Sequence, residues 1–187
     1  MRAAILTAAR ASLEREAFRE LSVDAIMEPT GLTRTAFYRY FDDLGALMAV
    51  LLAEATRPLL RAGSAVADAA RQADEAGFRG MLVDLATVFE EHGVVLEAAV
   101  AASQYDDAIE QRVREMRERF TELIAAGLIE RAAATGTDIP LPAETARALN
   151  AMNESYLLES FGRSRRVSAE EAADALWPIW RQLIFRV

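Results

Sequence analysis

A short segment near the N-terminus, Thr30–Phe41, limits what this chain can fold into more than any other stretch. Gly31 can adopt the positive φ that a sharp corner between two helices requires, and Thr33 is a favourable N-cap for the helix that follows. Phe37 and Phe41 lie four residues apart, so both face the same side of that helix. The segment therefore predicts a helix-turn-helix whose second helix buries two phenylalanines and exposes polar side chains.

The exposed side of this second helix carries hydroxyl, guanidinium and phenol groups. Arginine and threonine near the N-terminus of a helix can reach base edges in a DNA groove, and tyrosine hydroxyls suit phosphates. We therefore predict that the helix reads DNA through Thr33, Arg34, Thr35, Tyr38, Arg39 and Tyr40. The alternative is a surface helix that carries two arginines by chance.

The overall charge of the chain opposes nonspecific binding to nucleic acid. The formal net charge is −8 at pH 7, and all of the basic residues are arginine. Residues 1–55 contain six Arg and eight Asp or Glu, so even this segment is slightly acidic. A protein that reads a specific sequence needs a local basic patch, and dimerisation doubles its phosphate contacts. The charge therefore counts only mildly against a DNA-binding segment.

Composition argues against enzymatic and metal-dependent functions. The chain has no Cys and a single His, His92, so thiolate sites, histidine-based metal sites and Cys-His triads are excluded. We identify no catalytic residue, no metal ligand and no cofactor motif. No run of about eighteen uncharged apolar residues exists, and early charges interrupt a signal-peptide core. We therefore expect a cytoplasmic protein that makes no membrane contact.

A hydrophobic share of 52% with only nine Gly and five Pro favours an all-α fold. Ser22 is expected to cap the helix that precedes the Gly31 corner, and Pro29 is expected to end that helix. Pro58 is expected to kink or break a later helix. Gly93 is expected to end another helix, with His92 as its C-terminal cap. Periodicity and turn residues predict helices at 5–21, 23–28, 33–41, 46–70, 78–91, 94–103, 107–134, 143–161 and 168–187, with loops at 72–77 and 135–142.

The N-terminal segment resembles the DNA-binding domain of the TetR family of transcriptional regulators. The resemblance is carried without gaps by Ile5–Ala9, Phe18, Ser22–Ile26, Gly31–Phe41 and Ala46-Leu47. It implies an all-α homodimer, with a three-helix helix-turn-helix DNA-binding domain at residues 1–45 and a helical ligand-binding and dimerisation domain at 46–187. It also implies that the family's contacts to a double-stranded DNA operator fall on Thr33, Arg34, Thr35, Tyr38 and Tyr40.

Two features depart from the family pattern. Asp42-Asp43-Leu44-Gly45 stands where the family usually has Pro-Ser-Lys-Glu, so a lysine contact to phosphate is missing and two carboxylates lie beside the DNA backbone. Glu28 and Pro29 replace residues compatible with an unbroken second helix. These departures imply weak or strongly salt-dependent operator binding.

The C-terminal half resembles an actinobacterial subgroup of the same family, the one that includes the repressor of the ethionamide-activating monooxygenase. The resemblance rests on Leu149–Glu154, Phe161 and Trp177–Trp180. It implies an elongated apolar pocket crossed by two asparagines, which match Asn150 and Asn153. Three residues apart, the two amides lie on one face of a helix, where a ligand carbonyl or hydroxyl can satisfy them. The alternative is that each Asn caps a backbone group or lies at a wet interface.

The expected ligand is a small apolar molecule with a polar group. The candidate ligand-binding residues are Phe89, Phe120, Asn150, Asn153, Tyr156 and Trp180. The last helix is apolar over more than one face, which its own subunit is not expected to bury alone. We therefore expect a homodimer through the last two helices, arranged as a four-helix bundle. Pro178 is expected to kink the last helix.

Together these patterns favour a ligand-responsive transcriptional repressor that leaves a palindromic operator when it binds its ligand. The first alternative is an enzyme, which no set of residues supports. The second is a helical ligand sensor or adaptor that has lost DNA binding, which Asp42, Asp43 and the acidic N-terminal segment suggest.

Overall fold

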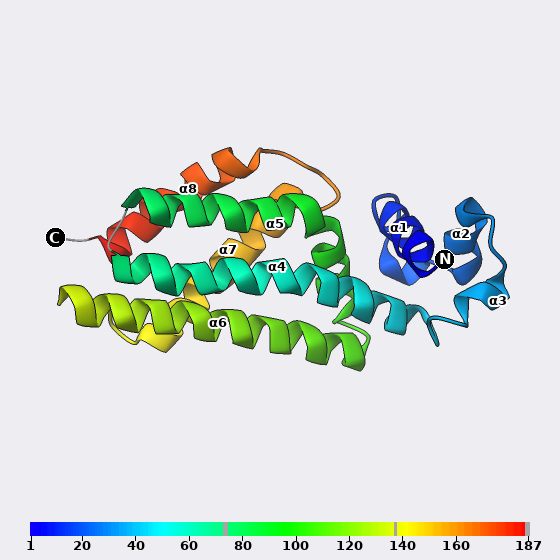
Figure 1. Cartoon of the computed structure of the whole chain (residues 1–187), viewed down its shortest axis with the longest axis horizontal. Coiled ribbons are helices and arrows are strands. Elements are labelled where there is room, and N and C mark those ends of the chain that lie inside the picture. The colour runs from blue at the N-terminus through cyan, green and yellow to red at the C-terminus, as the bar shows by residue number, and fades with distance from the viewer. Residues whose placement is uncertain (73–74, 137, 186–187) are drawn as a thin grey trace.

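The structure is a computed structural model that describes residues 1–72, 75–136 and 138–185, and these residues form helices and connecting loops without a strand. A small N-terminal head lies at one end of the molecule, and a larger helical body extends away from it (Figure 1). The predicted all-α class is confirmed.

The head is built from short helical segments whose ends follow local sequence signals. Ser22 Oγ accepts a hydrogen bond from the Ala25 N–H at 3.1 Å, so Ser22 caps the second α-helix as predicted. Pro29 lies just beyond the end of that helix, and Gly31 has φ 67° at the corner. The segments are α1 (Arg2–Leu13), η1 (Phe18–Glu20), α2 (Val23–Met27), η2 (Glu28–Thr30) and α3 (Arg34–Phe37).

A small apolar core determines which side of α3 remains exposed. Phe37 and Phe41 are 0% and 3% exposed, and their ring centroids are 5.5 Å apart. They belong to one buried cluster with Ile5 of α1 and Ile26 of α2. Because both phenylalanines point inward, the polar side chains between them are left on the outside.

Five longer helices form the body. α4 begins beside the head and continues into the body, where it packs against α5 and α6 (Figure 1). α7 packs on α5 and α6, and α8 packs mainly on α5. The helices are α4 (Leu44–Gln72), α5 (Glu75–Ala102), α6 (Asp107–Thr135), α7 (Pro142–Phe161) and α8 (Ala169–Ile184). α4 therefore runs from the head into the interior of the body, and α1 and η1 of the head also contact α5.

The boundaries of α6 and α7 agree with the predicted ones to within one residue, whereas α8 ends at Ile184, short of the predicted end at Val187; residues 186–187 lie outside the described ranges. Asp106 Oδ1 accepts hydrogen bonds from the first N–H groups of α6, each at 3.0 Å, and Gly136 ends this helix with φ 70°. Ser168 and Glu171 form a capping box at the start of α8. The predicted loop at 135–142 corresponds to the connection between α6 and α7, of which Thr137 lies outside the described residues.

The predicted helix end at Gly93 is wrong, because α5 is one helix from Glu75 to Ala102. A Cβ at Gly93 would lie 2.2 Å from the backbone oxygen of Phe161, so the glycine permits close packing of α5 on the end of α7. His92 consequently lies inside α5 and caps no helix end. The predicted loop at 72–77 is also wrong at Gln72, which ends α4, and at residues 75–77, which begin α5; residues 73–74 lie outside the described ranges.

Two prolines lie inside helices without ending them. Pro58 is within α4 and Pro178 is within α8. Because proline has no N–H, the carbonyls of Glu54 and Asp174 lose their usual helical donors. Both helices nevertheless continue past their prolines. A bend at either proline stays a prediction.

Replacing Gly93 with Ala should destabilise the protein by about 1–3 kcal/mol, because the added methyl overlaps the Phe161 backbone. Gly80→Ala is the matched control on the same helix, since nothing lies within 4 Å of its added Cβ; it should stabilise by roughly 0.5–1 kcal/mol. Urea unfolding followed by circular dichroism measures both variants. Equal stabilities would contradict the packing role of Gly93.

Candidate nucleic-acid interface and body cavity

All six side chains that were predicted to read DNA lie on the surface of the head. Thr33, Arg34, Thr35, Tyr38, Arg39 and Tyr40 are exposed. The two phenols retain 46% and 42% of their accessible surface, which is high for large apolar rings. α3 itself ends at Phe37, and residues 38–40 continue as a turn. The head thus presents a compact polar surface around a short helix.

Arg34 is held between two polar partners on this surface. One Nη donates to Asp24 Oδ2 at 2.7 Å, and the other donates to the Tyr38 hydroxyl at 3.0 Å. The Arg34 Cζ also lies 5.6 Å from the Tyr38 ring centroid. The hydrogen bond with Tyr38 and the charge of Asp24 raise the pKa of Arg34, so its guanidinium stays charged. The arrangement orients a cation on the outer side of α3, and Asp24 offsets part of its charge in the free head.

The corner before α3 depends on Thr30, which sequence reasoning missed. Its hydroxyl donates to the Met27 carbonyl at 2.7 Å and accepts from the Leu32 N–H at 3.1 Å. Thr33 occupies the N-cap position of α3, but its side chain makes no capping hydrogen bond. A threonine that bonds a backbone N–H two residues later is a known turn signal, and it identifies Thr30 as the residue that shapes the corner.

Asp43 has a structural role at the start of α4. Its Oδ1 accepts a hydrogen bond from the Ala46 N–H at 2.7 Å, so the carboxylate caps the helix and faces the positive end of the helix dipole. Asp42 is exposed beside it. One of the two acidic residues after Phe41 therefore stabilises the helix that connects head and body.

Removing this cap should be measurable. Asp43→Ala should lower the free energy of unfolding by about 1 kcal/mol, whereas Asp43→Ser retains a capping oxygen and should change it little. Asp42→Ala is the control for loss of a neighbouring charge and should stay within about 0.5 kcal/mol of the parent. Thermal unfolding of the three variants tests the assignment, which fails if Asp42→Ala costs as much as Asp43→Ala.

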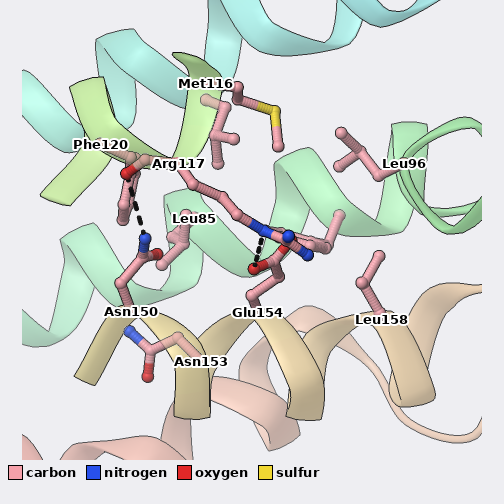
Figure 2. A pocket seen from close by; sticks show the side chains of 11 residues that line it. Leu85, Leu96, Met116, Arg117, Phe120, Asn150, Asn153, Glu154 and Leu158 are labelled. Atoms are coloured by element: carbon pink, nitrogen blue, oxygen red, sulfur yellow. Dashed lines mark hydrogen bonds and ion pairs between the residues drawn. The ribbon is translucent and has the colours of Figure 1, made fainter. Parts of the chain in front are cut away.

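The body encloses a narrow cavity between α4, α5, α6 and α7. Its volume is about 20 Å³, room for one or two water molecules. Apolar side chains form most of its wall; Asn150, Asn153 and Glu154 lie on the α7 side, and Arg117 reaches across from α6 (Figure 2). The lining consists of Leu59, Leu85, Phe89, Leu96, Met116, Arg117, Phe120, Asn150, Asn153, Glu154 and Leu158. A second cavity of about 10 Å³ shares Leu85, Phe120 and Asn153 with the first and reaches Trp180.

Asn153 carries a buried hydrogen-bond donor that has no partner. The residue is 2% exposed, and its Oδ1 accepts from the Trp180 Nε1–H at 3.3 Å. Because an indole N–H can only donate, the amide oxygen must face Trp180 and the amide NH₂ must face elsewhere. Nδ2 makes no hydrogen bond with any described residue. Leaving such a donor unpaired costs about 1–3 kcal/mol, so an acceptor placed in the cavity would be stabilising.

Asn150 is already paired with α6. Its Nδ2 donates to Thr121 Oγ1 at 3.0 Å. It also donates weakly to the Arg117 carbonyl at 3.5 Å (Figure 2). One turn further along α7, Glu154 accepts from Arg117 Nε at 2.8 and 3.0 Å. The Asn150 and Glu154 contacts both join α6 to α7. Sequence reasoning missed the ion pair and Thr121, because their partners are far apart in the chain.

The structure brings most of the predicted ligand-binding residues together. Phe89, Phe120, Asn150 and Asn153 line the larger cavity, and Trp180 lines the smaller one. Tyr156 is half-buried and lies outside the linings of both cavities. The two asparagines therefore differ: Asn153 offers a free donor, whereas Asn150 connects two helices.

The sequences of both the head and the body match those of known proteins. Residues 5–50 match the family described as bacterial regulatory proteins, tetR family, and residues 78–186 match the C-terminal domain of the transcriptional regulator EthR. The HTH-type transcriptional regulator EthR of Mycobacterium tuberculosis is 31% identical over 97% of this chain and 86% of that protein. The chain belongs to the tetR family.

Solved structures show the same fold at lower sequence identity. The TetR family regulator PfmR from Thermus thermophilus superposes with a TM-score of 0.78 and 20% identity, covering 98% of each chain. A transcriptional regulator from Pseudomonas aeruginosa gives 0.74 and 20%, covering 96% of this chain and 88% of its own.

Family membership confirms the predicted function. The protein is a ligand-responsive, DNA-binding transcriptional regulator of the repressor type, in a family of regulators and not of enzymes. Members of the family bind DNA operators and form homodimers. A sensor or adaptor that has lost DNA binding finds no support in these similarities. Across the described ranges, no helix is long and apolar enough to span a membrane.

Proposed function

We propose that a homodimer binds a palindromic operator through the exposed surface around α3. In this proposal Thr33, Arg34 and Thr35, at the start of the helix, approach base edges in the major groove. Tyr38, Arg39 and Tyr40 lie further along and contact phosphates. Two such helices fit successive grooves when they are about 34 Å apart. The exposure of all six side chains and the orientation of Arg34 by Tyr38 support the assignment.

The homodimer is proposed to form through α7 and α8. α8 buries more of its apolar surface within its own subunit than its sequence suggested, since Leu176, Trp180 and Ile184 are 1–3% exposed. What remains for a partner is centred on Ile179, which is 46% exposed, with the half-buried Trp177 nearby in sequence. Trp177 packs on Phe78 and Phe185 of its own subunit, so the exposed Ile179, together with the homodimers that the family forms, supports an interface at this helix.

The ligand is proposed to be a small apolar molecule whose polar group accepts a hydrogen bond from Asn153 Nδ2. The buried, unpartnered amide is the observation that carries this assignment. Phe89, Phe120 and Trp180 supply apolar contacts around it, whereas Tyr156 would contribute only indirectly. Because the cavity now holds at most one or two waters, a ligand must move its walls apart.

Movement of the cavity wall offers a route from ligand to DNA. Leu59 lines the cavity on α4, directly after Pro58, where the helix lacks one backbone hydrogen bond. The same helix begins at Leu44 beside the head, and Glu54 of α4 forms an ion pair with Arg10 of α1. A ligand that displaces α4 would favour a different spacing of the two heads and shift the population away from the DNA-binding state.

The DNA assignment predicts opposite effects for two kinds of substitution. Arg34→Ala and Tyr38→Ala should each weaken operator binding by about 1–3 kcal/mol, while Asp42→Asn should strengthen it several-fold by removing a repulsive charge. The operator comes from selection of genomic fragments at low salt, and fluorescence anisotropy measures the affinities. Unchanged affinity in Arg34→Ala, with the dimer intact, would refute the assignment.

The ligand assignment predicts that the two asparagines respond differently. N-octylacetamide, an apolar chain with one amide carbonyl, is a suitable neutral probe. Asn153→Leu should weaken its binding by at least about tenfold, because a charge-neutral hydrogen bond to a buried group is lost. Asn150→Leu should weaken it less, because Asn150 already donates to Thr121. Isothermal titration calorimetry compares the two variants, and equal effects would argue against a special role for Asn153.

A further inference from the structure

A groove on the surface of the body, formed by α4 and α6, collects positive charge. We call it the α4–α6 groove; its volume is about 300 Å³, and its floor includes Leu52, Leu60 and Met116. Arg57 of α4 and Arg112 and Arg119 of α6 lie around it, with Glu115 as the one acidic residue in its lining. This local excess of arginine stands out in a chain whose net charge is −8.

The three arginines of the groove have unused donors. None of them forms an ion pair with any residue of the described ranges, whereas Arg114 and Arg117 of the same helix pair with Glu110 and Glu154. Glu115 instead accepts a hydrogen bond from Gln111 at 3.0 Å. Guanidinium groups that converge on a groove without carboxylate partners are suited to a carboxylate or phosphate group.

The groove is separated from the internal cavity by a flexible side chain. Met116 lines both the α4–α6 groove and the cavity that contains Asn153. It is 6% exposed, so its side chain is buried between the two spaces. Methionine has several rotatable bonds and adapts readily to new neighbours, so a different rotamer would join the two spaces.

We propose that the α4–α6 groove binds the anionic head of an amphipathic ligand whose apolar chain passes Met116 into the cavity. This inference rests on the proposed ligand cavity and specifies its ligand class: an apolar chain with a carboxylate or phosphate at one end and a hydrogen-bond acceptor further along. The head contacts Arg57, Arg112 and Arg119, and the acceptor satisfies Asn153 Nδ2. A molecule in this position separates α4 from α6 next to Pro58, where α4 lacks a hydrogen bond.

A matched set of probes tests the charge selection. N-octanoylglycine, its methyl ester and N-octanoyl-ethylenediamine share the chain and the amide but end in an anion, a neutral group and a cation. N-octanoyl-O-phosphoethanolamine replaces the carboxylate with a phosphate. The full-length dimer is titrated with each probe at low and high salt, with tryptophan fluorescence as the signal, since Trp180 lines the smaller cavity. The anions should bind about tenfold tighter than the ester at low salt, and this preference should shrink as salt is added.

Variants separate the groove from the cavity. Arg112→Gln with Arg119→Gln should reduce the preference for the acid over the ester to about one and leave affinity for the ester unchanged. Arg114→Gln is the control on the same helix and should keep the preference. Asn153→Leu should weaken acid and ester alike, which reports on the cavity alone.

Each outcome discriminates between the two proposals. If the parent protein binds acid and ester equally and Asn153→Leu weakens both, the proposed anion site in the groove is wrong. The proposed ligand site in the cavity is then retained. If the double variant Arg112→Gln with Arg119→Gln still binds the acid more tightly than the ester, the proposed role of the groove is also wrong. Failure of every probe to bind contradicts both. Tighter binding of the phosphate probe than of the carboxylate identifies a phosphate head as the better ligand.

Discussion

The hydrogen bond from the Trp180 indole to the Asn153 amide oxygen determines which polar group in the wall of the body cavity is left without a partner. It joins α8 to α7 and fixes the amide so that its NH₂ group is left without a partner inside the fold. A buried donor in that condition costs about 1–3 kcal/mol, and the protein retains it in the wall of an apolar cavity. The cost is removed only when something else supplies an acceptor. A ligand that supplies the acceptor would recover this cost, and it would shift the conformation only as far as it binds one state more tightly than the other.

In the proposed mechanism, α4 carries the shift from the cavity wall toward the head. This helix runs without a break from Leu44 to Gln72, and α5, which also lines the cavity, contacts α1 and η1 of the head. The missing hydrogen bond to the Glu54 carbonyl makes this stretch easier to deform without uncoupling its ends. Glu54 also pairs with Arg10 of α1. The missing hydrogen bond of α4 thus lies between Leu59, which lines the cavity, and Glu54, which pairs with the head.

Features of this fold that depend on neighbouring residues could be predicted from the sequence, and features that depend on distant ones could not. Gly31 and Gly93 show the difference. Gly31 is required by its own positive φ, which a turn pattern reveals. Gly93 is required because Phe161 of another helix packs against it, so the local pattern suggested a helix end instead. The asparagines follow the same rule: their shared face was predictable, but only Thr121 and Trp180, on other helices, determine that Asn150 is paired and Asn153 is not. The Arg117–Glu154 ion pair was missed for the same reason, and so was the position of Tyr156 outside the cavities.

The electrostatic properties of each surface of this protein depend on where individual charged side chains lie and not on the net charge of the chain. Several acidic residues in and beside the head have local tasks: Asp43 caps α4, Asp24 pairs with Arg34, and Glu54 of α4 pairs with Arg10. A carboxylate that caps a helix or pairs with a guanidinium contributes little field at a distance, because its charge is offset nearby and the remainder is screened within about 8–10 Å at physiological salt. Arginines without such partners act over the same short range. A chain with a net charge of −8 can therefore still place arginines locally, as the proposals for α3 and for the α4–α6 groove require, because the two sites are built from different residues and neither depends on the sum.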